Sequence, residues 1–542
     1  MFKNALLVSL SIFSLQLFCI TTTAFADAAS ELEQADAYYK NKDYSQAEAI
    51  YQNVKTYYPG TEEAYKAYRK LVVLYIVTGN QSQEQATFQE LVTTYPDNIH
   101  TARAIHDIGS ACRNNLKKYY KAKQYYQYAK DNFSGSNYLI WSGKKYILCA
   151  LWAQKDIIKT ELCLGNDTAA EAGIQTMRSD FSDHNDLLAA LRSVADCYLK
   201  LKQYSKAAAL FQNILDTDPN DADAIHCQKG LVYSNIWLHN APNATETKAA
   251  IDKLVADFND HSNYAYAILR VGQEYYNKAL NLEVQDYTSQ AESNFSKAIE
   301  VWQPILTKEP FNLATVRAYY MTAQSYRKLG NCEEATEHYE HILDTWEEDE
   351  SMATYLIGSR KNLAILNIDM GYDPNALAQV EQLTADFNDN PQLPKAVFDI
   401  GEKFYYKALN NGHQDPNTGV GNYFSKALTV LGKITQGMSA SAERIATTHF
   451  YSAVCCYKAG DYAKAAQHYE KVVQNCPDYE FAWNAQFMVG GCYKKLTKAG
   501  DISNAVGQTK TRTAYEQLLI KYPNCKVASI VSSWLSKYSN TQ

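Results

Sequence analysis

Residues that interrupt helices are scarce in this sequence. Only 23 glycines and 12 prolines occur among its 542 residues, and the apolar–polar alternation typical of a half-buried strand is hard to find. Long windows with helical spacing dominate instead, for example residues 31–58. The scarcity of breakers and of strand patterns argues against a β-rich fold and predicts an all-α chain.

The sequence also lacks the common signatures of catalysis. It contains no HExxH, no GxxxxGK[ST] and no GxSxG motif, and its acidic residues and histidines are scattered. The densest cluster pairs His338 with His341, three residues apart on one helical face. A metal site is one interpretation; a solvated helix face is favoured, because Tyr339 takes the inward position. We therefore predict no enzyme activity, no catalytic residues, no cofactor and no metal.

No stretch of clustered cations stands out. The net charge is −7, and removing an N-terminal leader that holds Lys3 and no acid would make it −8. Nucleic acids and anionic lipids bind surfaces with clustered Lys and Arg. We therefore expect protein or peptide partners and no nucleic acid.

The cysteines form no CxxC motif. Removal of the leader with Cys19 would leave eleven of the twelve, an odd number that cannot all pair within one molecule. Small buried core residues are the favoured interpretation, and disulfides are the alternative. Cys476 and Cys492, in successive predicted helices, are the pair to test first.

A single long hydrophobic run occurs, from Ala5 to Ile20, followed by Ala24, Phe25 and Ala26. This layout is typical of a secretory signal over residues 1–26, cleaved after Ala26, which predicts an exported chain, periplasmic or secreted. A retained membrane anchor is one alternative, although the run is short for a bilayer span. A lipoprotein would use Cys19, but bulky Phe18 fits that signal poorly. The mature chain is then expected to have no integral span, with peripheral envelope association left open.

A repeated spacing organises the rest of the chain. The clearest unit has Tyr198, Ala207, Phe211, Ile214 and Pro219 as landmarks. Steps of four and three keep the small residue and the ring on one helical face, and the proline ends the helix. Each unit is therefore predicted to be a helical hairpin that must stack on its neighbours. Three further copies carry the spacing at Tyr38, Ala47, Tyr51, Val54 and Pro59; at Tyr326, Ala335, Tyr339 and Ile342; and at Cys456, Ala465, Tyr469, Val472 and Pro477.

These landmarks resemble the tetratricopeptide repeat (TPR) family, whose consensus has a tyrosine, an alanine, an aromatic and a terminal proline at these separations. The consensus tryptophan and the leucine–glycine pair of the first helix are mostly missing here. The resemblance extends over about residues 30–540. It implies a right-handed superhelical solenoid of roughly eleven or twelve tandem TPR-like hairpins.

A longer repeat divides the chain further. The motif from Gly272 to Asn281 recurs from Gly401 to Asn410, which indicates a duplicated block of hairpins. A long insert in the second block contains Asp415 and Asn417; a surface loop is favoured over a calcium site. The predicted organisation is a signal peptide (1–26), an N-terminal TPR-like array (27–244), a first duplicated block (245–344), a connecting helix (345–372), a second duplicated block (373–474), and a C-terminal repeat with a capping helix (475–542).

Tyrosine is unusually abundant, with 43 tyrosines against 18 phenylalanines and 7 tryptophans. Adjacent helical residues diverge by about 100°, so in each Tyr-Tyr pair one ring should pack and the other is a candidate for the surface. Exposed rings would suit peptide or glycan binding. The alternative is that all the rings fill wide grooves between helices. The pairs are Tyr38–Tyr39, Tyr119–Tyr120, Tyr125–Tyr126, Tyr275–Tyr276, Tyr319–Tyr320 and Tyr405–Tyr406.

In TPR proteins the first helices form the concave, partner-binding face. By resemblance, the partner-binding residues here are Tyr39, Lys40, Lys200, Tyr320, Gln324, Arg327, Lys328, Phe450, Tyr457 and Lys458. The Lys and Asn clamp for a terminal carboxylate is missing from the corresponding pairs, Leu32/Asp36, Arg192/Asp196, Tyr320/Gln324 and Phe450/Val454.

The favoured function is a non-catalytic exported scaffold that binds partner proteins or extended peptides on this face. The chain is similar to bacterial envelope TPR proteins of the outer-membrane assembly and Tol–Pal coordinator types, which implies a role in envelope assembly or maintenance. One alternative is an envelope enzyme or glycan-binding subunit acting on the cell wall. Another is a eukaryotic secreted protein, since Asn166 and Asn243 begin glycosylation acceptor triplets.

Overall fold

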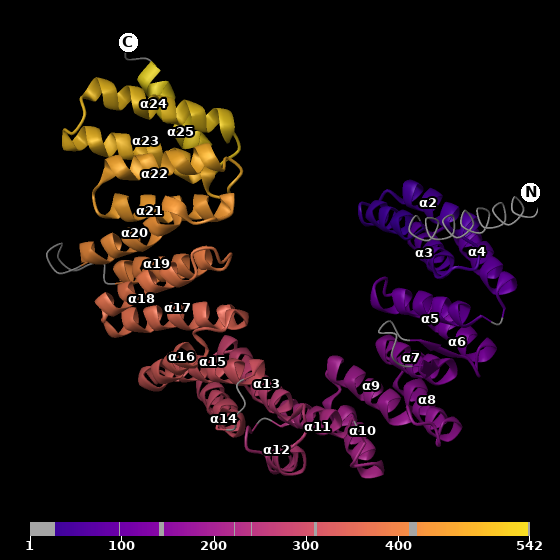
Figure 1. Cartoon of the computed structure of the whole chain (residues 1–542). Coiled ribbons are helices and arrows are strands. Elements are labelled where there is room, and N and C mark those ends of the chain that lie inside the picture. Colours follow the sequence, from indigo (N-terminus) through magenta and orange to yellow (C-terminus); the bar gives the residue numbers. More distant parts are fainter. Residues whose placement is uncertain are drawn as a thin grey trace, which may run out of the picture. The chain divides into compact units, whose positions relative to one another are not determined.

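The computed structural model describes residues 28–96, 98–139, 146–221, 223–239, 241–307, 312–410 and 420–539. The predicted leader (1–26) and the insert with Asp415 and Asn417 lie outside these ranges. Within the described residues the chain is a succession of helices, interrupted by one short β hairpin (Figure 1). The prediction of an all-α stack of paired helices is confirmed.

Contacts divide the chain into two compact units, residues 1–267 and 268–542. In each unit the helices alternate between the first and the second member of an antiparallel pair, here called A helices and B helices. The A helices of the first unit are the helical residues 28–40, α3 (Glu62–Thr78), α5 (Ile99–Asn114), α7 (Cys149–Leu164), α9 (Leu187–Lys200) and α11 (Ala224–Leu238). Its B helices are α2 (Tyr44–Tyr57), α4 (Gln81–Thr94), α6 (Tyr119–Asn132), α8 (Asp167–Asp180), α10 (Tyr204–Thr217) and α12 (Thr245–Phe258).

The second unit follows the same plan. Its A helices are α13 (Tyr264–Val284, which begins before the boundary), α15 (Leu313–Lys328), α17 (Ala353–Met370), α19 (Leu393–Asn410), α21 (Ala442–Lys458) and α23 (Ala482–Ala499). Its B helices are α14 (Thr288–Leu306), α16 (Cys332–Trp346), α18 (Asp373–Asp386), α20 (Val420–Gly437), α22 (Tyr462–Asn475) and α24 (Asn504–Lys521), and α25 (Ala528–Ser539) packs on α24. A 3₁₀ turn, η1 (Glu350–Met352), precedes α17.

Two predicted segments can be located on these elements. The duplicated blocks 245–344 and 373–474 begin at the B helices α12 and α18 and run to the B helices α16 and α22. Residues 345–372, predicted as a connecting helix, contain η1 and α17, and α17 packs against α18 as the A helix of a pair.

The repeat landmarks form the core of each pair. Every alanine, ring and aliphatic residue singled out in the four B helices is at most 1% exposed, namely Ala47, Tyr51, Val54, Ala207, Phe211, Ile214, Ala335, Tyr339, Ile342, Ala465, Tyr469 and Val472. The prolines Pro59, Pro219 and Pro477 follow closely after the ends of α2, α10 and α22, where a missing backbone donor costs nothing. The spacing therefore identified the buried stripe correctly.

The tight turn between paired helices needs a left-handed residue. Gly330 and Gly460 adopt φ of 80° and 85° at this point, as their sequence positions predict. Lys42 and Lys202 occupy the same place with φ of 65° and 59°, a conformation that is costly for a side chain with a Cβ. The turn is thus retained even where glycine is absent.

One feature of the fold was not predicted. β1 (Asn137–Leu139) pairs antiparallel with β2 (Tyr146–Leu148) between α6 and α7. Ile147 of β2 is buried in the surrounding core. Strands of three residues are too short to give a periodic signal in the sequence.

The six tyrosine pairs divide into three groups. In Tyr38–Tyr39 and Tyr319–Tyr320 both rings are half-buried. Tyr120 and Tyr406 are exposed beside more buried partners, as predicted. For Tyr125–Tyr126 and Tyr275–Tyr276 the prediction of one surface ring is wrong, since all four rings are at most 8% exposed. A helix inside a stack contacts neighbours on more than one side, so two rings 100° apart can both be covered.

All eleven cysteines of the described residues are free thiols, including Cys476 and Cys492. Seven of them are buried, in keeping with the interpretation that most are core residues: Cys112, Cys149, Cys197, Cys227, Cys455, Cys456 and Cys492.

Candidate peptide-binding face

Four of the predicted partner-binding residues lie together on α15, between α13 and α17 of the second unit. Tyr320, Gln324 and Arg327 follow one another by four and three positions, so they share one face of the helix. The hydroxyl of Tyr276 on α13 donates a hydrogen bond to Gln324 Oε1 at 3.1 Å. On the other side, Asn362 Nδ2 of α17 donates to the Tyr320 hydroxyl at 3.1 Å. Arg327 Nη1 donates to Asn362 Oδ1 at 3.3 Å, so three A helices are joined by one polar network, which we call the central face.

Aromatic packing fixes the orientation of Tyr320. Its ring lies edge-on to Tyr339 of α16 and to Tyr355 of α17, each at a centroid distance of 5.7 Å. Gly358 makes room for it, because a Cβ there would lie 2.8 Å from the Tyr320 hydroxyl oxygen. Tyr320 and Tyr355 nevertheless remain half-buried, so part of each ring is accessible. The rings and amides of the central face are therefore held in fixed orientations by contacts with neighbouring side chains.

Charged groups stand at the edge of the central face. Lys328 Nζ lies 2.7 Å from Glu283 of α13 in an exposed ion pair, which holds its ammonium group near the end of α15. Burial is the largest cause that raises the pKa of Tyr276, while nearby Arg327 lowers it. Tyr276 thus stays a neutral hydrogen-bond donor at neutral pH.

The remaining predicted partner-binding residues lie on other A helices of the two units. In the first unit Tyr39 packs on Tyr44 with centroids 5.6 Å apart, and Lys40 and Lys200 are exposed. In the second unit Phe450 contacts Tyr469 and Phe481, both at 5.8 Å, Tyr457 packs on Tyr462, and Lys458 is exposed. The structure therefore unites only the residues of α15 into one network.

Three members of the central face were missed from the sequence. Tyr276 belongs to a tyrosine pair that was noted without a role, and it lies one repeat before α15. Asn362 and Tyr355 lie on α17, whose sequence carries little amphipathic pattern because this helix is covered on several sides. Only packing of successive A helices brings these side chains to Tyr320 and Arg327.

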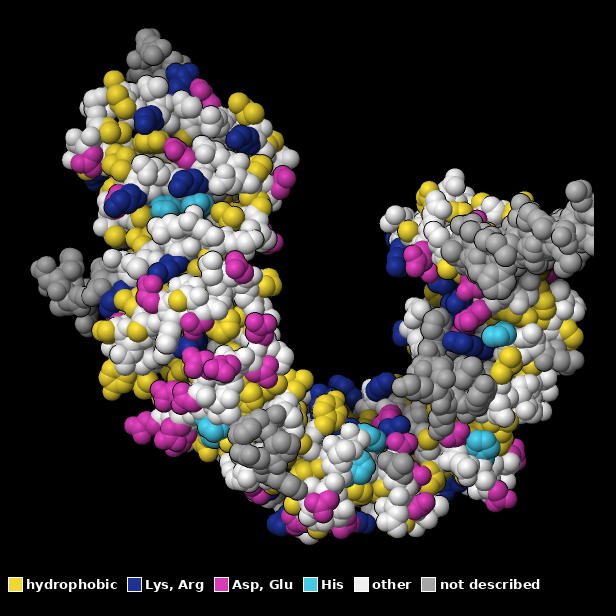
Figure 2. All heavy atoms as spheres, viewed as in Figure 1, with side chains coloured by type: hydrophobic (Ala, Val, Ile, Leu, Met, Phe, Trp, Pro, Cys, Tyr) yellow, Lys and Arg dark blue, Asp and Glu magenta, His cyan; other side chains and the backbone are white. Residues whose placement is uncertain are grey.

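The fold sorts charge by helix, although Lys and Arg are spread along the sequence. In the second unit the A helices α13, α15, α17, α19, α21 and α23 carry 15 Lys and Arg against 6 Asp and Glu. The B helices α14, α16, α18, α20, α22 and α24 carry 8 Lys and Arg against 12 Asp and Glu. Figure 2 shows acidic side chains gathered over the region of α16, which is one of these B helices.

The first unit has a weaker asymmetry. Its A helices, with residues 28–40 included, carry 11 Lys and Arg against 9 Asp and Glu, and its B helices carry 8 against 11. A chain with net negative charge thus concentrates its positive charge on one class of helix.

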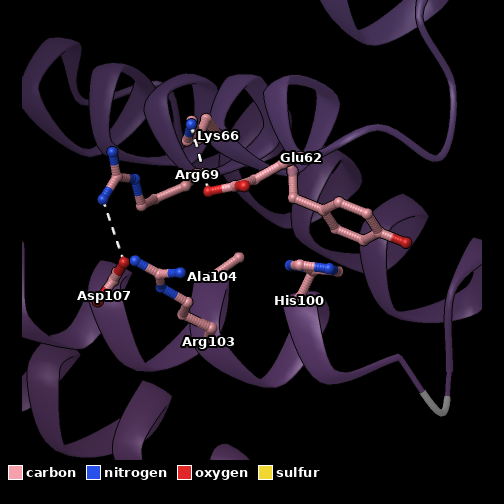
Figure 3. Close-up of a pocket in the computed structure, with 8 residues that line it drawn as sticks. Glu62, Lys66, Arg69, His100, Arg103, Ala104 and Asp107 are labelled. Atoms are coloured by element: carbon pink, nitrogen blue, oxygen red, sulfur yellow. Dashed lines mark hydrogen bonds and ion pairs between the residues drawn. The ribbon is translucent and has the colours of Figure 1, made fainter. Parts of the chain in front are cut away.

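A small cleft between two A helices of the first unit illustrates this basic character (Figure 3). Lys66 and Arg69 of α3 and Arg103 of α5 line it, with an empty volume of about 290 Å³. Arg69 Nη1 lies 3.1 Å from Asp107 of α5, and Lys66 Nζ lies 3.3 Å from Glu62 one turn away.

The predicted solvated histidine face on α16 is wrong in detail. His341 packs against the ring of Tyr319 at 4.3 Å, and His338 lies between Tyr319 and Tyr326 at 5.6 and 5.5 Å. Burial lowers the pKa of His338, and His341 lowers it further. Neighbouring α15 supplies the rings that cover both histidines. Among the described residues no group of three or more His, Cys, Asp or Glu side chains is placed to hold a metal ion.

None of the helices in the described ranges combines the length and apolarity that a bilayer crossing requires.

Comparison with known proteins identifies the repeats. Residues 446–479 match the tetratricopeptide repeat family, as do residues 29–61, 189–221 and 317–346. These matches contain the four units found from their spacing, so the chain contains tetratricopeptide repeats. No curated protein sequence matches the chain significantly.

Three of the solved structures that match this chain span most of its length. The Naa15/Naa10 structure bound to HypK-THB is 13% identical, covers 94% of this chain and 89% of its own, and gives a TM-score of 0.32. The APC/C hetero-tetramer Cut9-Hcn1 is 17% identical with 93% and 94% coverage and a TM-score of 0.23. Yeast Tom70 is 14% identical with 89% and 98% coverage and a TM-score of 0.28. Similarity this low carries no inference about partners or activity.

Proposed function

We propose, from the tetratricopeptide repeats of this chain, that it is a non-catalytic scaffold whose A helices hold an extended acidic segment of a partner protein. The observation that carries the proposal is the concentration of Lys and Arg on the A helices, 15 against 6 acidic residues in the second unit. A surface with this charge attracts acidic chains and repels basic ones.

The central face offers the groups that such a segment needs. The guanidinium of Arg327 supplies planar donors suited to a carboxylate. Gln324 is half-buried, and its amide can pair with the N–H and C=O groups of an extended backbone, whereas the buried Asn362 amide holds Tyr320 and Arg327 in position. The half-buried rings of Tyr320 and Tyr355 supply apolar contact area at little entropic cost. Charge alone would accept any anion, whereas amides and rings together favour a peptide.

Export is a further part of the proposal. It is supported by the pattern of residues 1–26, with one lysine, an apolar run and Ala24 and Ala26 before Asp27. An exported TPR scaffold would act in the periplasm or outside the cell, and a role in envelope assembly or maintenance is consistent with that location. Immunoblotting of secreted, periplasmic and cytosolic fractions for the processed chain tests this part separately.

Binding is tested with a defined probe. A fluorescein-labelled twelve-residue peptide of Glu, Asp, Leu and Ser is titrated with the full-length mature protein, and its affinity is followed by anisotropy at increasing salt. We expect binding that weakens as salt rises, because screening reduces the charge attraction. A peptide with Lys in place of Glu and Asp should bind at least tenfold more weakly.

Two charge-matched variants locate the site. Arg327→Gln/Lys328→Gln removes one cation of the central face and one at its edge. Each should contribute about 0.5–1 kcal/mol, so binding should weaken about five- to thirtyfold. Lys471→Gln/Lys521→Gln removes two exposed lysines of the B helices α22 and α24 and should leave affinity within about twofold. Equal losses in both variants would show that net charge alone binds the probe. Tighter binding of an oligonucleotide of the same charge would replace a protein partner by a nucleic acid.

A further inference from the structure

Two cysteine thiols meet between neighbouring A helices of the first unit. Cys163 lies in the last turn of α7, and Cys197 lies on α9, which packs directly against α7. The two side chains are joined by a hydrogen bond between their thiols. Residues 164–196 separate them in the sequence, so only the packing of successive A helices brings them together.

Cations from several elements surround this pair. Arg113 of α5, Lys117 of the following turn and Lys159 of α7 all act on Cys163. Arg113 is fixed by Asp156 of α7, whose carboxylate it contacts at 2.6 Å. His106 Nε2 approaches the same carboxylate at 2.8 Å. The buried Asp156 carboxylate is thus surrounded by more positive groups than its single negative charge can neutralise. The remaining positive charge acts on Cys163.

The two thiols have different acidities for clear reasons. The hydrogen bond with Cys197 lowers the pKa of Cys163 most, burial opposes this, and the three cations lower it further, to about 6. The same hydrogen bond and burial raise the pKa of Cys197. The lowered pKa of Cys163 favours its thiolate, the nucleophilic form of cysteine, with Cys197 as the hydrogen-bond donor.

Accessibility also distinguishes Cys163. It is half-buried, whereas Cys112, Cys149 and Cys227 are 0% exposed and burial raises each of their pKa values to about 12. Those three thiols behave as small core residues. Cys163 combines contact with a second thiol, nearby cations and partial exposure to solvent.

We propose that Cys163 and Cys197 form a reversible disulfide that links α7 to α9. The oxidant is a small-molecule disulfide, such as oxidised glutathione. The Cys163 thiolate attacks one sulfur of that molecule, forming a mixed disulfide and releasing one small thiolate. Cys197 then loses its proton and attacks the Cys163 sulfur, forming the protein disulfide and releasing the second small thiolate. Two protein thiols are oxidised as one small disulfide is reduced to two thiols.

The bridge would join consecutive repeats by a covalent bond. Repeat arrays are stabilised mainly through contacts between neighbours, so a link from α7 to α9 restricts opening at this point of the first unit. An exported chain would meet an oxidising environment in which such a bond persists. The inference does not depend on the proposed acidic partner.

Peptide mapping tests the link directly. The mature protein is equilibrated with oxidised and reduced glutathione at pH 7.5, blocked with an alkylating reagent and digested with trypsin without reduction. Cleavage after Lys159, Arg178, Arg192 and Lys200 releases each cysteine on its own peptide, residues 160–178 and 193–200. We expect a mass equal to the two peptides joined, and its loss on reduction. Free thiols at both positions under oxidising conditions, or a link from either one to another cysteine, would overturn the proposal.

Matched variants and a rate measurement complete the test. Cys163→Ser should abolish the joined mass, and Cys476→Ser, which alters another half-buried cysteine, should leave it intact. In the reduced protein, iodoacetamide should label Cys163 at least about tenfold faster at pH 7 than Cys332 or Cys525. Because labelling reports on the folded wild-type chain, it remains decisive even if a variant folds poorly. Equal labelling rates at all three positions would refute the assignment of Cys163 as the entry thiol.

Discussion

Two neighbouring glycines of α23 allow a sharp test of how paired helices pack. A Cβ built at Gly490 would lie 2.3 Å from ring atom Cε1 and 2.8 Å from Cδ1 of Tyr515 on α24. A Cβ built at Gly491 would meet nothing within 4 Å. We therefore expect Gly490→Ala and Gly491→Ala to change stability in opposite directions, although the substitution and the helix are the same.

The ring of Tyr515 has little space into which it could move. It is 2% exposed, the ring of Phe487 stacks on it at 5.7 Å, and Trp534 of α25 meets it edge-on at 5.1 Å. Overpacking of this kind costs about 1–3 kcal/mol, while replacing glycine by alanine inside a helix contributes about 1 kcal/mol. Because a separation of 2.3 Å is a severe clash, the overpacking cost should be about 2–3 kcal/mol, and the alanine gain offsets about 1 kcal/mol of it. Gly490→Ala should therefore lower the free energy of unfolding by about 1–2 kcal/mol, and Gly491→Ala should raise it by about 0.5–1 kcal/mol.

Amide hydrogen exchange of α23 and α24 is the suitable assay, because a repeat array can open locally without complete unfolding. Exchange in these helices should accelerate about five- to thirtyfold in Gly490→Ala and slow about two- to fivefold in Gly491→Ala. Protection in the first unit should stay unchanged in both variants, which serves as the internal control.

Slower exchange in both variants would refute the argument, because it would mean that the Tyr515 ring does not press on Gly490. Gly272→Ala offers an independent check in another pair. A Cβ there would lie 2.2 Å from Trp302 Nε1 on α14, and Trp302 is fully buried, so this variant should also be destabilised.

Three further predictions follow from buried charge, histidine titration and turn geometry. Asp156→Asn leaves Arg113 and Lys155 without the carboxylate that they contact, so the packing of α5 on α7 should be destabilised by about 3–5 kcal/mol. Amide hydrogen exchange in these two helices should become faster. Unchanged exchange would contradict the assignment of Asp156 as the buried partner of both cations. Burial, then His468 and Lys471, lower the pKa of His449 to about 4. The unfolded chain therefore binds more protons, so stability is complete above about pH 6.5 and falls by about 1–2 kcal/mol at pH 5. His449→Gln should flatten that loss in urea unfolding at pH 7.5 and 5.0, and an unaltered slope would count against it. Lys202→Gly should raise the free energy of unfolding by about 0.5–1 kcal/mol in thermal unfolding, because a φ of 59° suits glycine. Gly330→Ala should lower it by a similar amount. The reverse order would contradict the left-handed conformation at these two turns.

The sequence determined the pairing of helices and the residues that fill each pair. Ala207, Phe211 and Ile214 are separated by helical steps, so they fall on one stripe whatever the rest of the chain does. Turn glycines and closing prolines act through their own backbone geometry, which is equally local. These features could therefore be predicted from the sequence and are found in the structure. The β1–β2 hairpin could not be predicted, because its strands are too short to show a periodic pattern.

Contacts between successive A helices were decided only by the tertiary structure. Tyr276, Tyr320 and Asn362 lie about one repeat apart, and their hydrogen bonds depend on how each helix rotates against the next. Cys163 and Cys197 meet for the same reason. The unequal distribution of Lys and Arg between A and B helices also becomes visible only in the fold. The net charge of the sequence, −7, does not distinguish the two classes of helix. Local spacing fixes what a helix buries, whereas the angle and register between helices fix which polar groups from different repeats come together.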